Sequence, residues 1–377
     1  MKFSFDADLD YQRQAIDAVT GLFKGQEAMT SQFTVHAHPS AHAGFEGLSD
    51  LGYGNMLHLD RETILANLRE VQNRTGLAPE PSLDSMNFTI EMETGTGKTY
   101  VYLRTIYELN QLYGFTKFMV VVPSVAIKEG VETSIRMLRE HFAALYGNPP
   151  MNFFQFDGSN PSRIRSFATS PSIEIMIATV GAINKKTNKI YQPAEDLDFE
   201  VPADLIRATK PIIIVDEPQS VYGDTGNGRK KGAGRSALEN FNALATLRYS
   251  ATHPKDDKAN LVYRLDAIAA YEKQLVKQIE VDSLVTSSSG TTPYVRFLGA
   301  KRGRAGAITA RVEVDVEEGN EIKRKAVTVD TGSRSNLADA TGRDLYKDLT
   351  VVAINAAEGQ QNISFDTVAQ PLGDLRL

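Results

Sequence analysis

Residues 94–99 have the types and spacing of a phosphate-binding loop. The segment Thr94-Gly95-Thr96-Gly97-Lys98-Thr99 follows a short apolar run and precedes a helical pattern, which is the strand–loop–helix context that such a loop requires. Glycines let backbone N–H groups approach phosphate oxygens without a Cβ in the way, and the helix N-terminus adds free donors and the positive end of its dipole. Lys98 can reach the β- and γ-phosphates of a nucleotide, and the hydroxyl of Thr99 can ligate Mg²⁺.

The match to the strict loop pattern is incomplete, because Met92 stands where that pattern has its first glycine. A glycine-rich turn before a helix is therefore the alternative interpretation. A second segment argues against it. Asp216-Glu217-Pro218-Gln219 follows four consecutive β-branched apolar residues, and a carboxylate in the position of Asp216 is where Mg²⁺ is held opposite the loop threonine. The neighbouring Glu217 is then placed to orient or deprotonate the attacking water.

Alternating strands and helices must position these residues. Short apolar runs, typical of strands buried on both faces, recur along residues 88–250 with helical patterns between them. This alternation predicts a parallel α/β sheet with right-handed crossovers, in which ligands bind at the carboxyl ends of the strands. The residues that could do chemistry stand at those ends: Gly95 to Thr99, Pro123-Ser124, Thr179, Asp216-Glu217 and Ser250-Ala251-Thr252.

The N-terminal region predicts two amphipathic helices and a loop-rich stretch. Helical spacing of apolar residues indicates one helix up to Phe23, capped by Asp8 or Asp10, and a second over residues 60–75. Residues 24–58 show no clean period and predict a loop. Three histidines in that stretch have a spacing that could ligate a metal, but no carboxylate or thiol partner accompanies them, so loop histidines are the preferred interpretation of His36, His38 and His42.

Composition places the chain among ordinary globular proteins. Its 377 residues are 42% hydrophobic and 23% charged, and the net charge of −6 means that any nucleic-acid binding must use local basic patches. The absence of cysteine excludes disulfides, Cys-ligated zinc and thiol catalysis. Neither a signal-peptide pattern nor an apolar run of membrane-spanning length is present, so we expect a cytoplasmic protein that does not enter a membrane.

Taken together, these segments resemble the N-terminal part of the Res subunit, the restriction and translocation subunit of type III restriction enzymes, within the superfamily 2 helicases. Residues 92–99 are similar to motif I, 122–127 to motif Ia, 177–179 to motif Ib, 216–219 to motif II and 250–253 to motif III. The methionine in motif I and the Asp-Glu-Pro-Gln form of motif II point to type III subunits. The resemblance covers about residues 5 to 285.

The resemblance implies a RecA-like P-loop NTPase domain that binds ATP with Mg²⁺, with double-stranded DNA and a type III modification (methyltransferase) subunit as partners. It implies catalytic roles for Lys98, Asp216 and Glu217 and metal binding by Thr99 and Asp216. Gln12, which its helical pattern alone would leave solvated, is similar to the glutamine that contacts adenine. The remaining implied roles are coupling by Ser250, Ala251 and Thr252, and DNA contact by Pro123, Ser124 and Thr179.

The C-terminal residues follow a different pattern. From Pro293 onward, alternation with period two, interrupted at Gly319-Asn320, predicts an antiparallel hairpin and meander, similar to a small β-rich insertion in the family. A group of basic residues there belongs either to a solvated strand face or to a phosphate-binding surface, and the same two interpretations hold for residues 229–235. The group comprises Lys301, Arg302, Arg304, Lys323, Arg324 and Lys325.

We therefore expect an α/β fold: a RecA-like parallel sheet flanked by helices, followed by a small antiparallel β-rich region. The expected divisions are an N-terminal helical segment at 1–85, a RecA-like ATP-binding domain at 86–282 and a β-rich insertion at 283–377. Neither the motifs of a second RecA-like domain nor a nuclease core is recognised in the sequence, so we expect a fragment or truncated product of a restriction-enzyme motor. The alternative is a stand-alone nucleotide-binding module that binds DNA or a partner without hydrolysis.

Overall fold

The computed structural model describes residues 6–35, 50–158, 160–197, 199–223, 231–253, 260–276, 293–303, 307–319, 321–332, 334–357 and 361–366. The chain divides into two compact units, Met1–Ile279 and Glu280–Leu377. The finer division at residue 85, and the placing of the second boundary at 282, stay predictions. His36, His38 and His42, residues 229–230 and Arg304 lie outside the described residues.

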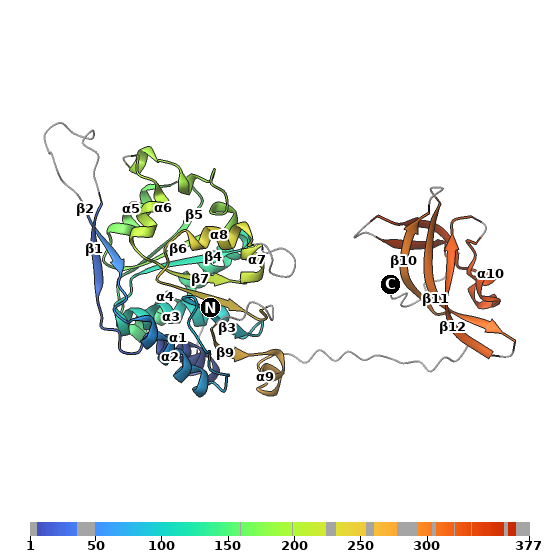
Figure 1. Ribbon diagram of the computed structural model, residues 1–377, viewed down its shortest axis with the longest axis horizontal. Coiled ribbons are helices and arrows are strands. Elements are labelled where there is room, and N and C mark those ends of the chain that lie inside the picture. Colours follow the sequence, from blue (N-terminus) through green and yellow to red (C-terminus); the bar gives the residue numbers. More distant parts are fainter. Residues whose placement is uncertain are drawn as a thin grey trace. The chain divides into compact units, whose positions relative to one another are not determined.

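The first unit is built around a seven-stranded sheet in the order β5-β6-β4-β7-β8-β3-β9 (Figure 1). All neighbouring strands are parallel, which confirms the predicted α/β fold class. The edge strand β9 was not predicted. The strands are β3 (Asn87–Met92), β4 (Lys117–Val122), β5 (Met151–Phe156), β6 (Ile173–Thr179), β7 (Ile212–Asp216), β8 (Ala245–Ser250) and β9 (Leu261–Leu265).

Helices cover both faces of this sheet. The continuous apolar run of β4 shows why: Phe118, Val120 and Val122 enter one core, whereas Met119 and Val121 enter the core on the other face. Among the described residues, no helix combines the length and apolar character needed to cross a membrane. The first core is formed with α1 (Asp10–Gly21), α2 (Arg61–Arg74), α3 (Lys98–Tyr113) and α4 (Val125–Tyr146), and the second with α5 (Ser162–Thr169), α6 (Pro202–Ala208), α7 (Pro218–Tyr222) and α8 (Ala233–Glu239). Among the described residues, this unit also contains η1 (Val180–Ala182), η2 (Lys189–Tyr191), η3 (Glu195–Leu197) and α9 (Ala267–Glu272).

The predicted cap of α1 was wrong. Leu9 occupies the N-cap position without a side-chain hydrogen bond to the helix. Asp8 instead lies 3.0 Å from the guanidinium of Arg13. The second helix begins as the sequence predicts, with Asp60 accepting a hydrogen bond from the backbone N–H of Thr63 at 2.8 Å.

Two strands lie in the stretch that was predicted to be a loop. β1 (Thr30–Val35) and β2 (Asp50–Asn55) form an antiparallel pair. Glycines in β2 hide the alternation by which a strand is recognised in the sequence. One of them, Gly52, pairs with Phe33, and a Cβ at Gly52 would lie 2.4 Å from the ring of Phe33. The glycine therefore makes room for the aromatic side chain of the neighbouring strand.

Asn55, at the end of β2, links the β1–β2 pair to the seven-stranded sheet through hydrogen bonds. Its side chain is fully buried, and its Nδ2 donates to the backbone carbonyls of Lys117 and Lys210 at 2.8 and 3.2 Å. Its Oδ1 accepts from the backbone N–H groups of Thr116 and Lys117 at 2.8 and 3.1 Å. The amide thus satisfies four backbone groups at the amino end of the sheet.

We predict that Asn55→Ala lowers the free energy of unfolding by about 2 to 4 kcal/mol, because each buried polar group left without a partner costs roughly 1 to 3 kcal/mol. Chemical denaturation of the purified chain measures this change. Thr34→Ala, at an exposed position of the paired strand β1, is the matched control and should have little effect. A loss for Asn55→Ala no larger than that of the control would contradict the prediction.

The second unit contains small antiparallel sheets, as predicted. Three strands, β10 (Val295–Arg302), β11 (Ile308–Glu318) and β12 (Glu321–Asp330), form a meander, while β13 (Thr350–Asn355) and β14 (Asn362–Asp366) form a separate pair that was not predicted. The helical elements α10 (Leu337–Thr341) and η5 (Asp344–Tyr346) precede β13. A core that includes Val312, Leu337 and Tyr346 holds the unit together.

The basic residues of β12 are paired within this unit. Lys323 lies 3.0 Å from Glu321, Arg324 lies 2.9 Å from Asp315, and Lys325 pairs with Glu318. These carboxylates offset the charge that a phosphate-binding surface would need. The pairing favours the solvated-face interpretation of these three residues.

Candidate nucleotide site

The predicted phosphate loop joins β3 to α3 at the carboxyl edge of the sheet. Gly95 and Gly97 have φ values of 82° and 90°, in a region that side chains rarely adopt. Apart from its chain neighbours, no atom of the described residues lies within 4 Å of a Cβ placed at Gly95, whereas a Cβ at Gly97 would lie 2.6 Å from Nε2 of Gln12. The backbone at Gly95 therefore borders open space, as the approach of a phosphate group requires.

Helix α1 contacts this loop through Tyr11 and Gln12. The hydroxyl of Tyr11 and the Nε2 of Gln12 both donate to the backbone carbonyl of Thr96, each at 3.1 Å. Gln12 is only 6% exposed, so it is not the solvated residue that its helical pattern alone suggests. A pocket of about 350 Å³ lies beside it, lined by apolar, aromatic and polar groups that include Leu9, Gln12, Gly97, Thr99, Tyr100 and Met137.

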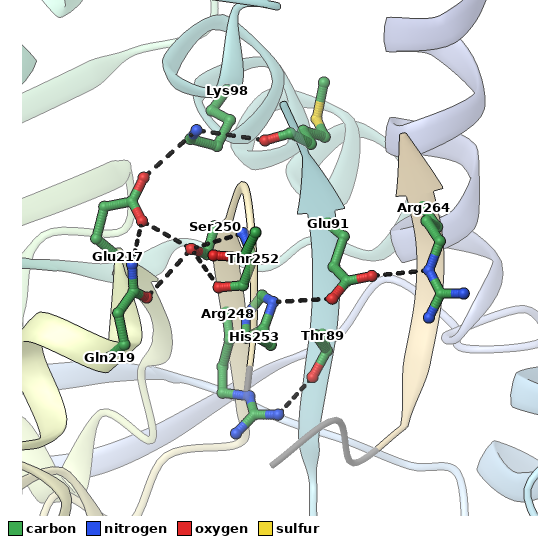
Figure 2. A network of polar contacts seen from close by, with 11 residues as sticks. Thr89, Glu91, Lys98, Glu217, Gln219, Arg248, Ser250, Thr252, His253 and Arg264 are labelled. Carbon is green, nitrogen blue, oxygen red and sulfur yellow. Dashed lines mark hydrogen bonds and ion pairs between the residues drawn. The ribbon is translucent and has the colours of Figure 1, made fainter. Parts of the chain in front are cut away.

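Lys98 and Glu217 meet across the site (Figure 2). The Nζ of Lys98 lies 3.4 Å from Oε1 of Glu217 and donates to the backbone carbonyl of Met92 at 3.3 Å. Lys98 begins α3 and Glu217 follows β7, so the contact joins the two segments that the sequence suggested separately. Both distances are long for charge-assisted hydrogen bonds, so phosphate oxygens at closer range would compete well for the ammonium group.

The backbone of Glu217 adopts an uncommon conformation. Its φ of 53° and ψ of 64° lie in the left-handed region, at the N-cap of α7. For a residue other than glycine this costs on the order of 1 kcal/mol or more and persists only where the surroundings fix it. Here Ser250 Oγ and Gln219 Nε2 both donate to Oε2 of Glu217, at 2.7 and 2.6 Å. One carboxylate oxygen is therefore held, while the other lies towards Lys98.

The two adjacent carboxyl groups differ in acidity. Burial, together with the charge of Glu217, raises the pKa of Asp216 to about 6, although Lys98 opposes the shift. Burial also acts to raise the pKa of Glu217, but hydrogen bonds from Ser250 and Gln219 and the charge of Lys98 outweigh it and lower that pKa overall. Asp216 thus lies where a cation would be stabilising, and Glu217 stays ionised, as a base requires.

The side chains at this edge fit Mg²⁺ in the company of a nucleotide. Within the described residues, no three His, Cys, Asp or Glu side chains are grouped so that they could hold a metal ion by themselves. Mg²⁺ in nucleotide sites typically has one or two protein oxygens, and phosphates and water complete its octahedral shell. Asp216 and Thr99 supply a carboxylate and a hydroxyl of this kind from the end of β7 and the start of α3.

The residues predicted to contact DNA stand at the same edge of the sheet. Ser124 accepts a hydrogen bond from the N–H of Ile127 at 3.4 Å at the start of α4, and Thr179 ends β6 and precedes η1. Three exposed lysines follow between η1 and the start of η2, and they were not among the predicted site residues: Lys185, Lys186 and Lys189. Their close spacing in the sequence was the available signal.

Comparison with known proteins agrees with the predicted resemblance. Residues 8–255 match the family model "Type III restriction enzyme, res subunit". The chain is 31% identical over 303 residues to the Res subunit of the type III restriction-modification enzyme EcoP15I from Escherichia coli, and 30% identical over 298 residues to that of EcoPI from Escherichia phage P1. Each alignment covers 74% of this chain but 29% of the relative, so the chain spans less than a third of the length of either relative.

A solved structure of a Sulfolobus solfataricus SWI2/SNF2 ATPase core in complex with double-stranded DNA also matches, at 15% identity with a TM-score of 0.28, covering 46% of this chain and 29% of that one. The family assignment rests on the sequence match, which includes the loop, motif II and motif III. Because that match spans well over half of the chain, this protein belongs to the Res-subunit family of type III restriction enzymes.

Proposed function

We propose that this chain provides the ATP-binding and ATP-hydrolysing part of a DNA motor in a type III restriction enzyme. The observation that supports this most strongly is the contact between Lys98 and Glu217 at the carboxyl edge of the sheet. It joins a glycine loop, with open space at Gly95, to a pair of adjacent carboxylates of different acidity. That combination supplies phosphate binding, a metal ligand and a base, which are among the parts that phosphoryl transfer to water uses.

Each residue of the site has a role in the proposed reaction. The backbone of Thr94 to Gly97 and the Nζ of Lys98 hold the phosphates, and Glu217 orients and deprotonates the attacking water. Thr99 and Asp216 would hold Mg²⁺, which when bound neutralises charge that develops on the transferred phosphoryl group. Gln12 and the pocket beside it would take the adenine ring, since the amide can read polar edges of a base.

Double-stranded DNA is the proposed track of this motor. Pro123, Ser124 and Thr179 would contact its backbone, and the exposed lysines of the loop after Thr179 would add phosphate contacts. Ser250, Ala251 and Thr252 would couple hydrolysis to movement, because Ser250 contacts the catalytic carboxylate directly. The names of the relatives describe restriction-modification enzymes, so a modification (methyltransferase) subunit is the proposed protein partner, in the cytoplasm.

Lys98→Ala is expected to weaken ATP binding by about 100-fold or more, because hydrogen bonds to charged phosphate oxygens contribute roughly 1.5 to 3 kcal/mol each. Equilibrium titration of the purified chain with fluorescently labelled ATP and Mg²⁺ measures the affinity. Lys24→Ala, which removes an exposed lysine paired with Glu70, is the matched control. Equal affinity in parent and Lys98→Ala would remove the phosphate loop from the proposed function.

A further inference from the structure

The strand that leads into the phosphate loop carries a buried carboxylate that the proposed reaction does not use. On β3, Phe88, Ile90 and Met92 enter the core with α1–α4, so Glu91 lies on the opposite face of the strand. Glu91 is only 3% exposed. Burying a carboxylate is unfavourable unless opposite charge or hydrogen bonds compensate, so its surroundings indicate why it is there.

Two basic side chains from different elements flank this carboxylate (Figure 2). Arg264 of β9 donates from Nε to Oε2 of Glu91 at 2.8 Å, and Nδ1 of His253 lies 3.7 Å from Oε1. The His253 side chain is fully buried, and neither of its ring nitrogens has a hydrogen-bond partner among the described residues. Among the described residues, Glu91 thus offers His253 a carboxylate oxygen at ion-pair distance.

The sheet order explains what Glu91 connects. β3 lies between β8 and β9, and Glu91 is in register with Ser250 on one side and Arg264 on the other. His253 follows β8 at the end of motif III. The next residue of β3 is Met92, whose carbonyl accepts from Lys98. The Glu91 cluster therefore links motif III, the strand before the phosphate loop and the edge strand β9.

At the other end of motif III, the hydroxyl of Ser250 has three hydrogen-bond acceptors within reach. Its hydroxyl lies 2.7 Å from Oε2 of Glu217, 3.1 Å from Oε1 of Gln219 and 2.9 Å from the carbonyl of Thr252. It has one proton to donate, so these bonds compete. Phosphates that attract Lys98 would take positive charge away from Glu217. Its carboxylate would then accept more strongly from Ser250, at the expense of the bonds to Gln219 and Thr252.

We propose that Glu91 is a positioning residue that anchors motif III through His253, so that a change at Ser250 on nucleotide binding is passed to β9. With one end of the segment fixed, a stronger bond from Ser250 to Glu217 at the other end moves the backbone between them. Without Glu91 to hold His253, residues 250–253 adjust locally, and the change at Ser250 does not reach β9. The inference rests on the proposed function, because it requires a nucleotide in the loop.

Hydrogen–deuterium exchange of the full 377-residue chain, with and without Mg-ATP, tests the proposal. In the parent, Mg-ATP should protect residues 93–101 and also change exchange at 245–253 and 261–265. In Glu91→Gln, which keeps the shape and removes the charge, protection at 93–101 should persist while the response at 245–253 is lost. Exchange there should also be about tenfold faster in the nucleotide-free variant, since the segment loses a charged anchor.

Two further variants separate positioning from a general loss of stability. Glu174→Gln alters another buried carboxylate of the same sheet, hydrogen-bonded to Asn152 on β5, and should keep the parent's response at motif III. Arg264→Gln, at a side chain that is 39% exposed, should keep the response at 245–253 and lose it at 261–265.

The outcomes distinguish this inference from the proposed function. A parent-like nucleotide response at 245–253 in Glu91→Gln would overturn the inference, whatever the variant does to stability. So would protection at 93–101 in the parent with no change at 245–253. Absence of protection at 93–101 in the parent would instead contradict nucleotide binding itself, and the inference with it.

Discussion

Purified as a 377-residue polypeptide, the chain should bind Mg-ATP but hydrolyse it very slowly, with or without DNA. In phosphoryl transfer, an arginine that reaches the γ-phosphate raises the rate by about 10³ to 10⁵. The family resemblance implies that such an arginine comes from a second RecA-like domain across the cleft. The described residues contain one parallel α/β sheet, and the predicted nucleotide-binding residues all lie in the unit that holds it.

Steady-state ATPase assays with and without long duplex DNA measure this. We expect turnover far below about one per second, the lower end of the usual range for enzymes, and no large stimulation by DNA. Lys98→Ala, prepared in parallel, reports any contaminating activity. DNA-stimulated turnover near one per second or above would mean that an arginine of this chain or of a second copy completes the site.

Glu217→Gln should slow the chemical step by about 10² to 10⁴, the usual contribution of a positioned base. Binding of Mg-ATP should be kept or become tighter, because the carboxylate acts on the water in the transition state and its charge repels the γ-phosphate. The hydrogen bond from Ser250 can persist, since the amide oxygen of glutamine still accepts.

Single-turnover hydrolysis of labelled ATP, followed over hours because the parent is expected to be slow, separates this effect from binding. Glu239→Gln, an exposed carboxylate paired with Lys231, is the control. If Glu217→Gln loses ATP affinity as Lys98→Ala does, Glu217 has a structural or metal-binding role and the assignment of the base is wrong.

The parts of the site that could be predicted from the sequence are those with local patterns. Gly95 to Thr99 form a loop in a strand–loop–helix context, and Asp216 ends a buried strand. Because parallel strands share one carboxyl edge, both segments could be expected there before any contact between Lys98 and Glu217 was known. The family match was predictable for the same reason, since it rests on those segments.

Other features have no local pattern. Gln12 looks solvated on its helix, and only the packing of α1 against the loop buries it at the carbonyl of Thr96. Glu91 interrupts an apolar run without showing that His253 and Arg264, far along the chain, will lie beside it. The pairing of Arg324 with Asp315 likewise follows from the register of β11 and β12, in which the two residues are opposite each other.

The loop and Asp216 should bind Mg-ATP together. The most direct test is the ATP affinity of the parent and of Asp216→Asn, each in Mg²⁺ and in EDTA, at about pH 8, where a carboxyl group with a pKa of about 6 is ionised. We predict that Mg²⁺ strengthens ATP binding to the parent. This gain should shrink as the pH falls through 6, because protonation of Asp216 removes the ligand. Asp216→Asn should lose most of the gain, while its affinity in EDTA is kept or becomes tighter. An equal gain in ATP affinity from Mg²⁺ in Asp216→Asn and in the parent would contradict the binding of Mg-ATP by Asp216.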